Sequence, residues 1–232
     1  MKTAFITGST RGIGRQIGIV LLNKGYHVIF NYAHNDNDAK ELKKYLMTYK
    51  LSGTFQIFKA DMSIIKNYSL PKLDVLILNA GITDRTPFGA ISVPSWDKVF
   101  DVNLTVPFFL IQSMRNKISR NGKILFISSI AGCTTDSTSI SYGVSKGALH
   151  VLVPYLAKAF AQKKITVNAI APGYIDTMWH TKKSKSQLKR IAQKCLAKRL
   201  GTTAEIAKLA LHIIENDFIN GQVIRCDGGF QL

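Results

Sequence analysis

The opening of the chain constrains the fold most strongly, because three glycines stand between two short apolar segments. Residues 2–7 are rich in β-branched and aromatic side chains, and Gly8, Gly12 and Gly14 follow them. A helical pattern comes next, and a second short strand is predicted at residues 26–30. A strand, a glycine turn, a helix and a strand within about 30 residues form a βαβ unit, the context of a dinucleotide-binding turn.

Each glycine has its own expected role in such a turn. Gly8 permits the tight bend, Gly12 lets the backbone approach a pyrophosphate, and Gly14 lets the helix pack closely. The free N–H groups and the positive dipole end of the helix favour a phosphate at the same place. We therefore expect nucleotide contacts from Gly8, Ser9, Thr10, Arg11, Gly12, Ile13 and Gly14.

The end of the second strand favours NADP(H) over NAD(H). An acidic residue there would hydrogen-bond a ribose 2′-hydroxyl and repel a 2′-phosphate, but residues 30–34 contain no acid. Arg11 can pair with a 2′-phosphate, and Asn31 is expected to line the same site. Asp36 and Asp38 lie further along the chain and are expected to open the next helix.

Strand and helix patterns alternate along the rest of the chain, which indicates a parallel sheet covered on both faces. We expect one α/β domain over residues 1–232, a Rossmann-type doubly wound sheet that binds the dinucleotide and carries the catalytic residues. Twelve residues separate Asp61 from Asp74. The crossover helix at about 62–73 is therefore expected to be shortened or lost.

A second motif places three polar side chains near one another. Tyr142 and Lys146 are four residues apart, so they share one face of a helix. Ser129 follows the strand predicted at residues 123–128. A phenol is a poor acid–base group at neutral pH, but a neighbouring ammonium lowers its pKa. A phenol, an ammonium and a hydroxyl could thus surround one carbonyl group.

Taken together, these motifs resemble the short-chain dehydrogenase/reductase family over essentially the whole chain. Within the family, residues 8–14, 28–33, 165–173 and 220–223 are most similar to bacterial 3-oxoacyl-[acyl-carrier-protein] reductases. The resemblance implies NADPH-dependent reduction of a 3-oxoacyl thioester in fatty acid synthesis. The motifs that carry it are Thr7-Gly8-x-x-x-Gly12-Ile13-Gly14, Asp61, Asn79-Ala80-Gly81, Asn103, Ser129, Tyr142, Lys146, Pro172-Gly173 and Asp227-Gly228-Gly229.

The resemblance also assigns catalytic roles. Tyr142 would protonate the substrate oxygen, and Lys146 would hold the nicotinamide ribose and lower the Tyr142 pKa. Ser129 would hydrogen-bond the carbonyl, and Asn103 would hold a water that links Lys146 to solvent.

Cofactor contacts are implied along the rest of the pocket. Asp61 would contact the adenine and Asn79 the adenosine ribose, while Ile175 and Thr177 would contact the nicotinamide. The full implied set beyond the glycine turn is Asn31, Asp61, Met62, Asn79, Ala80, Gly81, Tyr142, Lys146, Pro172, Gly173, Ile175 and Thr177.

Two departures from the family pattern bear on structure. Leu78 replaces an asparagine that the family often has, which is expected to alter strand packing more than chemistry. Pro154 lies eight residues past Lys146, where it removes a backbone donor and is expected to kink the helix. The family builds a homotetramer through this helix and the C-terminal segment, so Pro154 bears on assembly.

The charge of the chain is uneven. The net charge is +17, and eight of the 31 basic residues lie between Lys182 and Arg199. In the family this region, about residues 176–200, forms a helical lid over the substrate, and here Ile191, Cys195 and Leu196 give it an apolar stripe. The charge suits either a solvated face or an acidic partner such as acyl carrier protein. A nucleic-acid site is disfavoured, since Trp179 is the lone aromatic of the lid.

Other features restrict the protein class. Cys133, Cys195 and Cys226 are widely spaced and odd in number, which suggests reduced thiols in a cytoplasm. The five histidines form no cluster, so no catalytic metal is expected. No apolar run is long enough for a transmembrane helix, and a strand at residue 2 or 3 leaves no room for a signal peptide.

Three hypotheses remain open at this point. The first is reduction of a 3-oxoacyl thioester on acyl carrier protein. The second is the same chemistry on another carbonyl, such as an acyl-CoA, a sugar, a steroid or a small ketone. The third is an NADP-binding regulator without turnover, which the set of Asn103, Ser129, Tyr142 and Lys146 disfavours because a binder would not need it.

Overall fold

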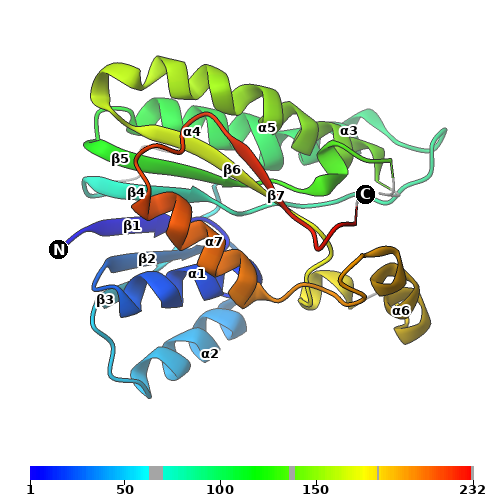
Figure 1. The fold of residues 1–232 in the computed structure, drawn as a ribbon, viewed down its shortest axis with the longest axis horizontal. Coiled ribbons are helices and arrows are strands. Elements are labelled where there is room, and N and C mark those ends of the chain that lie inside the picture. The colour runs from blue at the N-terminus through cyan, green and yellow to red at the C-terminus, as the bar shows by residue number, and fades with distance from the viewer. Residues whose placement is uncertain (63–69, 136–138, 182, 231–232) are drawn as a thin grey trace.

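The computed structural model describes residues 1–62, 70–135, 139–181 and 183–230. Within these residues seven parallel strands form one sheet in the order β3-β2-β1-β4-β5-β6-β7 (Figure 1). The predicted doubly wound α/β sheet is therefore confirmed. The strands are β1 (Thr3–Ile6), β2 (His27–Tyr32), β3 (Thr54–Lys59), β4 (Leu73–Leu78), β5 (Ile118–Ile127), β6 (Thr166–Pro172) and β7 (Val223–Cys226).

Both faces of the sheet are buried, because consecutive strand residues point to opposite sides. In β1, Ala4 and Ile6 join one apolar cluster and Phe5 joins the other. In β2, Phe30 and Ile29 divide between the two clusters in the same way. Strands buried on both faces read as nearly continuous apolar runs, which is how the sequence presents them.

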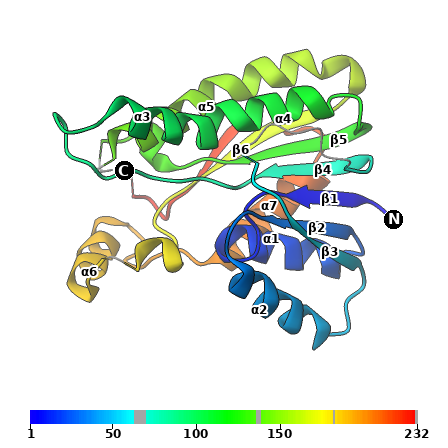
Figure 2. The same cartoon turned by 180° about the vertical axis from the view of Figure 1, so that it is seen from behind.

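Helices cover each face as a layer (Figures 1 and 2). One layer contains α1 (Gly12–Asn23), α2 (Asp36–Met47) and α7 (Thr203–Glu215), and the other contains α3 (Val93–Phe100), α4 (Val106–Met114) and α5 (Ile140–Ala159). Helix α6 (Lys185–Lys194) lies beyond the carboxyl ends of the strands. The short turns are a π-helical segment at Asp101–Thr105 and 3₁₀ segments at Ile130–Gly132, Ala161–Lys163 and Met178–His180.

The strand order reverses between β1 and β4, and this reversal positions the site. From β1 the chain adds β2 and β3 on one side, and then crosses to β4 on the other. In open parallel sheets the crevice outside the carboxyl ends at such a point binds ligands. The glycine turn after β1 and the Asn79-Ala80-Gly81 segment after β4 both open into it.

Two structural expectations from the sequence stay predictions. Most of the crossover segment lies at 63–69, outside the described residues, so the shortening or loss of its helix stays a prediction. Pro154 lies inside α5, which is helical from Ile140 to Ala159, and the expected kink there stays a prediction.

The described residues contain no helix that is long and apolar enough to cross a membrane. The same part of the chain contains no group of three or more His, Cys, Asp or Glu side chains placed to hold a metal ion.

Candidate active site

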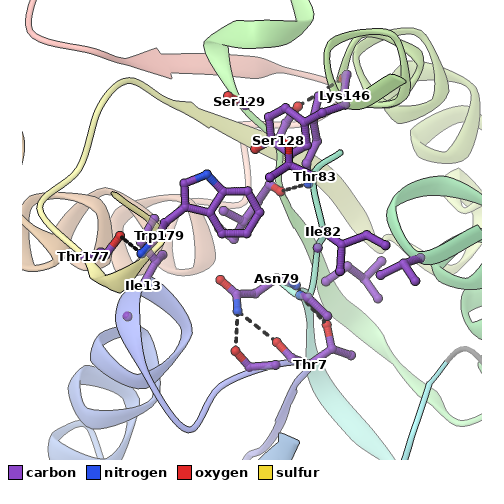
Figure 3. Close-up of a pocket in the computed structure, with 18 of the residues that line it drawn as sticks. Thr7, Ile13, Asn79, Ile82, Thr83, Ser128, Ser129, Lys146, Thr177 and Trp179 are labelled. Atoms are coloured by element: carbon purple, nitrogen blue, oxygen red, sulfur yellow. Dashed lines mark hydrogen bonds between the residues drawn. The ribbon is translucent and has the colours of Figure 1, made fainter. Parts of the chain in front are cut away.

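A pocket of about 1050 Å³ lies at the carboxyl ends of the central strands. Its lining runs from the glycine turn, past the ends of β2 and β4, to Ser129, Tyr142 and Lys146. Figure 3 shows Ile13 and Asn79 at one end of this space, Ser129 and Lys146 at the other, and Trp179 between them. The two motifs of the sequence therefore meet in one cavity.

The glycine turn adopts the backbone conformation that its residues permit. Gly8 and Gly12 have φ of 58° and 59°, in the left-handed region that glycine occupies without strain. A Cβ at Gly8 would lie 3.0 Å from the Ala80 Cα, whereas at Gly12 the nearest atom would be a Thr177 methyl at 3.9 Å. Gly8 is thus packed against the neighbouring strand end, and Gly12 leaves backbone open to the pocket, as a pyrophosphate requires.

Side chains of Thr7 and Asn79 tie the turn to β4. The Asn79 Nδ2 donates to the carbonyls of Thr7 (3.0 Å) and Gly8 (2.8 Å), and the N–H groups of Asn79 and Ala80 each donate to Thr7 Oγ1 at 3.0 Å (Figure 3). Gly14 makes room for this clamp, because a Cβ there would lie 2.5 Å from Asn79 Nδ2. Gly14 therefore allows α1 to pack closely, as expected, and the group that packs against it is the Asn79 side chain.

Asn31 supports the turn from the other side. Its Oδ1 accepts the Gly8 N–H at 3.3 Å, and its Nδ2 donates to the Ala60 carbonyl at 2.9 Å. The Ser9 hydroxyl is fully buried, where it donates to the Ile6 carbonyl and accepts the Asn31 N–H. The Asn31 and Ser9 side chains therefore stabilise the turn through hydrogen bonds to backbone groups.

Most of the predicted site residues line the pocket. Those that do are Gly8, Thr10, Arg11, Gly12, Ile13, Asn31, Asp61, Met62, Asn79, Ala80, Gly81, Ser129, Tyr142, Lys146, Pro172, Gly173, Ile175 and Thr177. Ser9, Gly14 and Asn103 lie behind the pocket wall, because their atoms are packed against Asn31, Asn79 and Ile82.

At the catalytic end, α5 presents Tyr142 and Lys146 to Ser129. The Tyr142 side chain hydrogen-bonds Ser129. Lys146 Nζ donates to the Ile127 carbonyl at 2.9 Å and lies 5.7 Å from the centre of the Tyr142 ring. The helix begins beside these groups, with the Ser139 hydroxyl accepting the Tyr142 N–H as a cap.

The expected lowering of the Tyr142 pKa is wrong for this structure. Burial raises the pKa of Tyr142 to about 12, and the hydrogen bond with Ser129 opposes this only in part. Burial also lowers the pKa of Lys146 to about 8, so the ammonium is itself destabilised. At neutral pH Tyr142 is a neutral phenol, which is the form that donates a proton.

Asn103 holds the backbone beside Lys146. Its Oδ1 accepts the Ile82 N–H at 2.9 Å, and its Nδ2 donates to the Ile82 carbonyl and to Ser145 Oγ, both at 3.0 Å. A Cβ at Gly81 would lie 3.2 Å from this Oδ1 and 3.5 Å from Lys146 Nζ. Both Nδ2 donors are therefore engaged, whereas Oδ1 accepts one of the two hydrogen bonds it can take, and the water expected from the resemblance stays a prediction.

The backbone carbonyl of Asn103 is a second group that could accept a hydrogen bond from this water. Asn103 lies in the π-helical segment Asp101–Thr105, and Pro107 four residues later has no N–H to donate to the Asn103 carbonyl. Short π-helical segments within helices frequently mark functional sites. The sequence signal was Pro107 itself, which the sequence reasoning did not use.

Ser128 and His150 are a further pair that the sequence reasoning missed. Ser128 Oγ donates to the Lys146 carbonyl at 3.1 Å and lies 2.9 Å from His150 Nε2. Burial and the nearby Lys146 lower the pKa of His150, so the imidazole is neutral. These contacts hold the backbone of α5 in place at Lys146.

The segment at 176–200 is the roof of the pocket, and the part of it that lines the pocket is Thr177, Met178, Trp179, His180 and Lys183. The residues that flank its two ends are paired, because Ile175 forms a β-bridge with Gly201. Its Trp179 ring lies 5.7 Å from the Tyr142 ring at an interplanar angle of 43°. The predicted apolar stripe is only partly correct: Cys195 is buried and Ile191 packs beside it, but Leu196 is 61% exposed.

Asp38, at the opposite end of the pocket, lies closer to the glycine turn than its position in the sequence indicated. Asp36 and Asp38 do open α2, as predicted. Asp38 is nevertheless not too far along the chain to reach the site, because α2 begins beside the glycine turn. Its Oδ2 lies 3.4 Å from Arg11 Nη1, and it lines the pocket.

Comparison with known proteins gives consistent matches over the chain. A family model described as enoyl-(acyl carrier protein) reductase matches residues 8–231. The 3-oxoacyl-[acyl-carrier-protein] reductase FabG of Buchnera aphidicola subsp. Baizongia pistaciae is 34% identical, with 100% of this chain and 98% of the relative covered. An acetoacetyl-CoA reductase of Rhizobium meliloti is also 34% identical, with 98% of each covered.

A solved structure supports the same fold. The angucycline C-6 ketoreductase LanV with bound NADP superposes with a TM-score of 0.89 at 25% identity. The match covers 99% of this chain and 95% of that structure.

Proposed function

Because this chain belongs to the short-chain dehydrogenase/reductase family, we propose that it reduces the ketone of a 3-oxoacyl thioester with NADPH, and that acyl carrier protein bears the thioester. One observation carries the proposal. Ser129, Tyr142 and Lys146 lie at one end of a single pocket whose other end is the glycine turn. A hydride donor and a proton donor can therefore both reach the same carbonyl group.

The residues of the pocket fit a dinucleotide. The cavity is large, Gly12 leaves backbone exposed, and the start of α1 directs free N–H groups at the same place. When bound, NADPH would supply the hydride. Arg11, Ile13, Asn79 and Thr177 would hold it along the pocket.

The chemistry assigned to this chain is proton supply and charge stabilisation. Tyr142 would donate its proton to the carbonyl oxygen, which gains negative charge as hydride arrives, and Ser129 would donate a hydrogen bond to the same atom. The high pKa of Tyr142, about 12, keeps its proton in place until that charge develops. Lys146 and a water at the Asn103 carbonyl would then return a proton to Tyr142.

A second candidate substrate is an acyl-CoA thioester, since the Rhizobium relative is an acetoacetyl-CoA reductase. The basic face of α6 favours the carrier-borne thioester. Lys185, Lys189 and Arg190 are exposed there, and the same segment contains no acid. A long-range attraction of this kind suits an acidic protein better than a small molecule.

We propose in addition that the chain assembles as a homo-oligomer, in keeping with the family's homotetramers. Apolar side chains are exposed along α4 and α5, which belong to the same helix layer as α3. They are Phe109, Val144, Val151 and Tyr155. Size-exclusion chromatography with light scattering tests the proposal, and a monomer at micromolar concentration would contradict it.

The test of function is NADPH oxidation with acetoacetyl thioesters on acyl carrier protein and on CoA, at low and moderate salt. Turnover that favours the carrier form and weakens with salt is expected. Equal turnover of both at every salt concentration would mean that the carrier is not recognised, and faster turnover of the CoA form would favour the acyl-CoA substrate. A crotonyl thioester serves as the control for reduction of a C=C bond, as the description of the family model suggests. NADPH binding without turnover of any thioester would direct the search to other carbonyl compounds.

A further inference from the structure

The adenosine end of the pocket carries an ion pair whose two members have opposite expected effects on a nucleotide. Arg11 Nη1 lies 3.4 Å from Asp38 Oδ2, and both residues line the pocket. The Arg11 side chain is 62% exposed and that of Asp38 is 23% exposed. A cation that could pair with a 2′-phosphate is thus already paired with a carboxylate.

The start of α2 fixes the position of Asp38. Asn35 caps this helix, with its Oδ1 accepting the N–H groups of Asn37 and Asp38, both at 3.1 Å. Asp38 therefore stands in the first turn, where the helix dipole stabilises a carboxylate. The same cap engages two of the N–H groups at the start of α2.

Neighbouring charged groups have other partners. Asp36 accepts hydrogen bonds from the Tyr32 hydroxyl at 2.8 Å and from Lys59 Nζ at 2.7 Å. Arg15, one helical turn after Arg11, lies over the Tyr45 ring at 4.5 Å. Among the described residues, Asp38 is the acid within ion-pair distance of Arg11.

We propose that Asp38 sets the preference between NADPH and NADH by competing for Arg11. This inference rests on the proposed function, in which Arg11 contacts the 2′-phosphate. A 2′-phosphate must take the place of the carboxylate beside Arg11 and then lie next to that negative charge. A 2′-hydroxyl is uncharged and can donate a hydrogen bond to Asp38. Asp38 therefore weakens NADPH binding and supports NADH binding.

Fluorescence titration of NADPH and NADH with the 232-residue chain tests the inference. Asp38→Asn removes the charge but keeps the size and a polar oxygen. It is expected to tighten NADPH binding about twofold to fivefold and to leave NADH binding equal or weaker, an effect typical of a partly exposed charge pair. Asp36→Asn is the matched control, because it removes an acid from the same helix turn without touching Arg11. It should leave the ratio of the two dissociation constants unchanged.

Arg11→Ala and the double variant Arg11→Ala/Asp38→Asn show whether Asp38 acts through Arg11. The gain in NADPH affinity from Asp38→Asn should shrink in the Arg11→Ala background. Any loosening of α2 by these changes affects both nucleotides alike, so the ratio reports charge alone.

An unchanged ratio in Asp38→Asn, with NADPH still bound by the original chain, would overturn this inference and leave the proposed function standing. If the original chain binds neither nucleotide, the proposed function fails and this inference fails with it.

Discussion

The floor of the pocket, which consists of the glycine turn and the carboxyl ends of the strands, and the roof, residues 176–200, are stabilised in different ways. In the floor, Thr7, Ser9 and Asn31 are buried and hydrogen-bonded to backbone groups of the turn or of neighbouring strands. In the roof, α6 contains no buried residue among those described, and its Ser184–Gln187 capping box lies in solvent. The floor is thus determined by the core of the sheet, whereas α6 is stabilised mainly from within.

The roof contacts the rest of the protein at several points, among them Trp179 on Tyr142 and Arg199 with Glu205. Cys195 Sγ donates to the carbonyls of Asp227 (3.3 Å) and Gly228 (2.9 Å), and its side chain packs with Ile130 and Phe230. Ile130 directly follows Ser129, so the roof is joined to the catalytic end of the floor. Helix α6, all of whose residues the structure describes, itself contributes no buried residue, and lid segments are drawn from regions of this kind.

This difference predicts that changes in the floor alter chemistry or stability, and changes in the roof alter substrate binding. The largest effect is expected at Tyr142. Tyr142→Phe removes the proton donor while the ring and its packing on Trp179 stay. Turnover should fall about 10³-fold, as for loss of a general acid, with NADPH affinity nearly unchanged.

Steady-state reduction of an acetoacetyl thioester and NADPH titration measure the two quantities for Tyr142→Phe. Turnover within tenfold of the original chain would show that another group supplies the proton. A matching loss of NADPH affinity would mean that the variant disturbs the floor instead of the chemistry.

Lys146 should make stability depend on pH. Its folded-state pKa, about 8, is below its ordinary value of 10.5, so the unfolded chain holds the proton more tightly. Stability should therefore rise as pH increases from about 8 to about 10.5, by up to about 3 kcal/mol. Tyr142 acts in the opposite sense at higher pH, since its folded-state pKa is raised from 10 to about 12.

Urea unfolding across this pH range, compared between the original chain and Lys146→Met, isolates the contribution of Lys146. The effect of Tyr142 is common to both proteins, so it cancels in the difference. A difference that stays constant from pH 8 to pH 10 would mean that burial does not destabilise the ammonium.

The floor was predictable from the sequence because its signals are local. A glycine turn between a strand and a helix, and a tyrosine four residues before a lysine, specify geometry within one βαβ unit or one helix. The sheet followed from the alternation of such units. Two of the three glycines in this turn, Gly8 and Gly12, line the pocket, and Gly14 lies directly behind it.

What the sequence did not predict depends on tertiary position. Asp38 is 27 positions from Arg11 and meets it only because α2 starts beside the turn. Trp179 was treated as part of a basic lid, yet its ring packs on Tyr142. The direction of the Tyr142 pKa was wrong because burial, which spacing does not reveal, raises this pKa by more than the hydrogen bond with Ser129 lowers it.

Gly18 tests the rigidity of the floor. A Cβ at this position in α1 would lie 2.1 Å from Phe30 Cε1, and the Phe30 ring is fully buried. Gly18→Ala should therefore lower the free energy of unfolding by about 1–3 kcal/mol, as overpacking of a core does. The exposed roof residue Gln193 is the comparison, and Gln193→Ala should change stability by less than about 0.5 kcal/mol. Equal losses in urea unfolding would contradict the difference between floor and roof.

The smallest expected effect concerns the charge of the roof. Lys189→Ala combined with Arg190→Ala removes two exposed cations from α6. If the roof attracts an acidic carrier protein, the KM for the carrier-borne thioester should rise about threefold to tenfold, while turnover of a small ketone stays the same. Stability should also stay the same, because neither side chain is buried.

Lys43→Ala combined with Lys44→Ala is the matched control for this change, because it removes the same net charge from exposed positions on α2. Helix α2 lies away from α6 in both views of the fold (Figures 1 and 2). An equal rise in KM for the two double variants would mean that total charge attracts the carrier, without a docking role for α6. No rise in either would leave the basic residues of α6 as a solvated face, and the preference between thioesters would then have to come from the pocket itself.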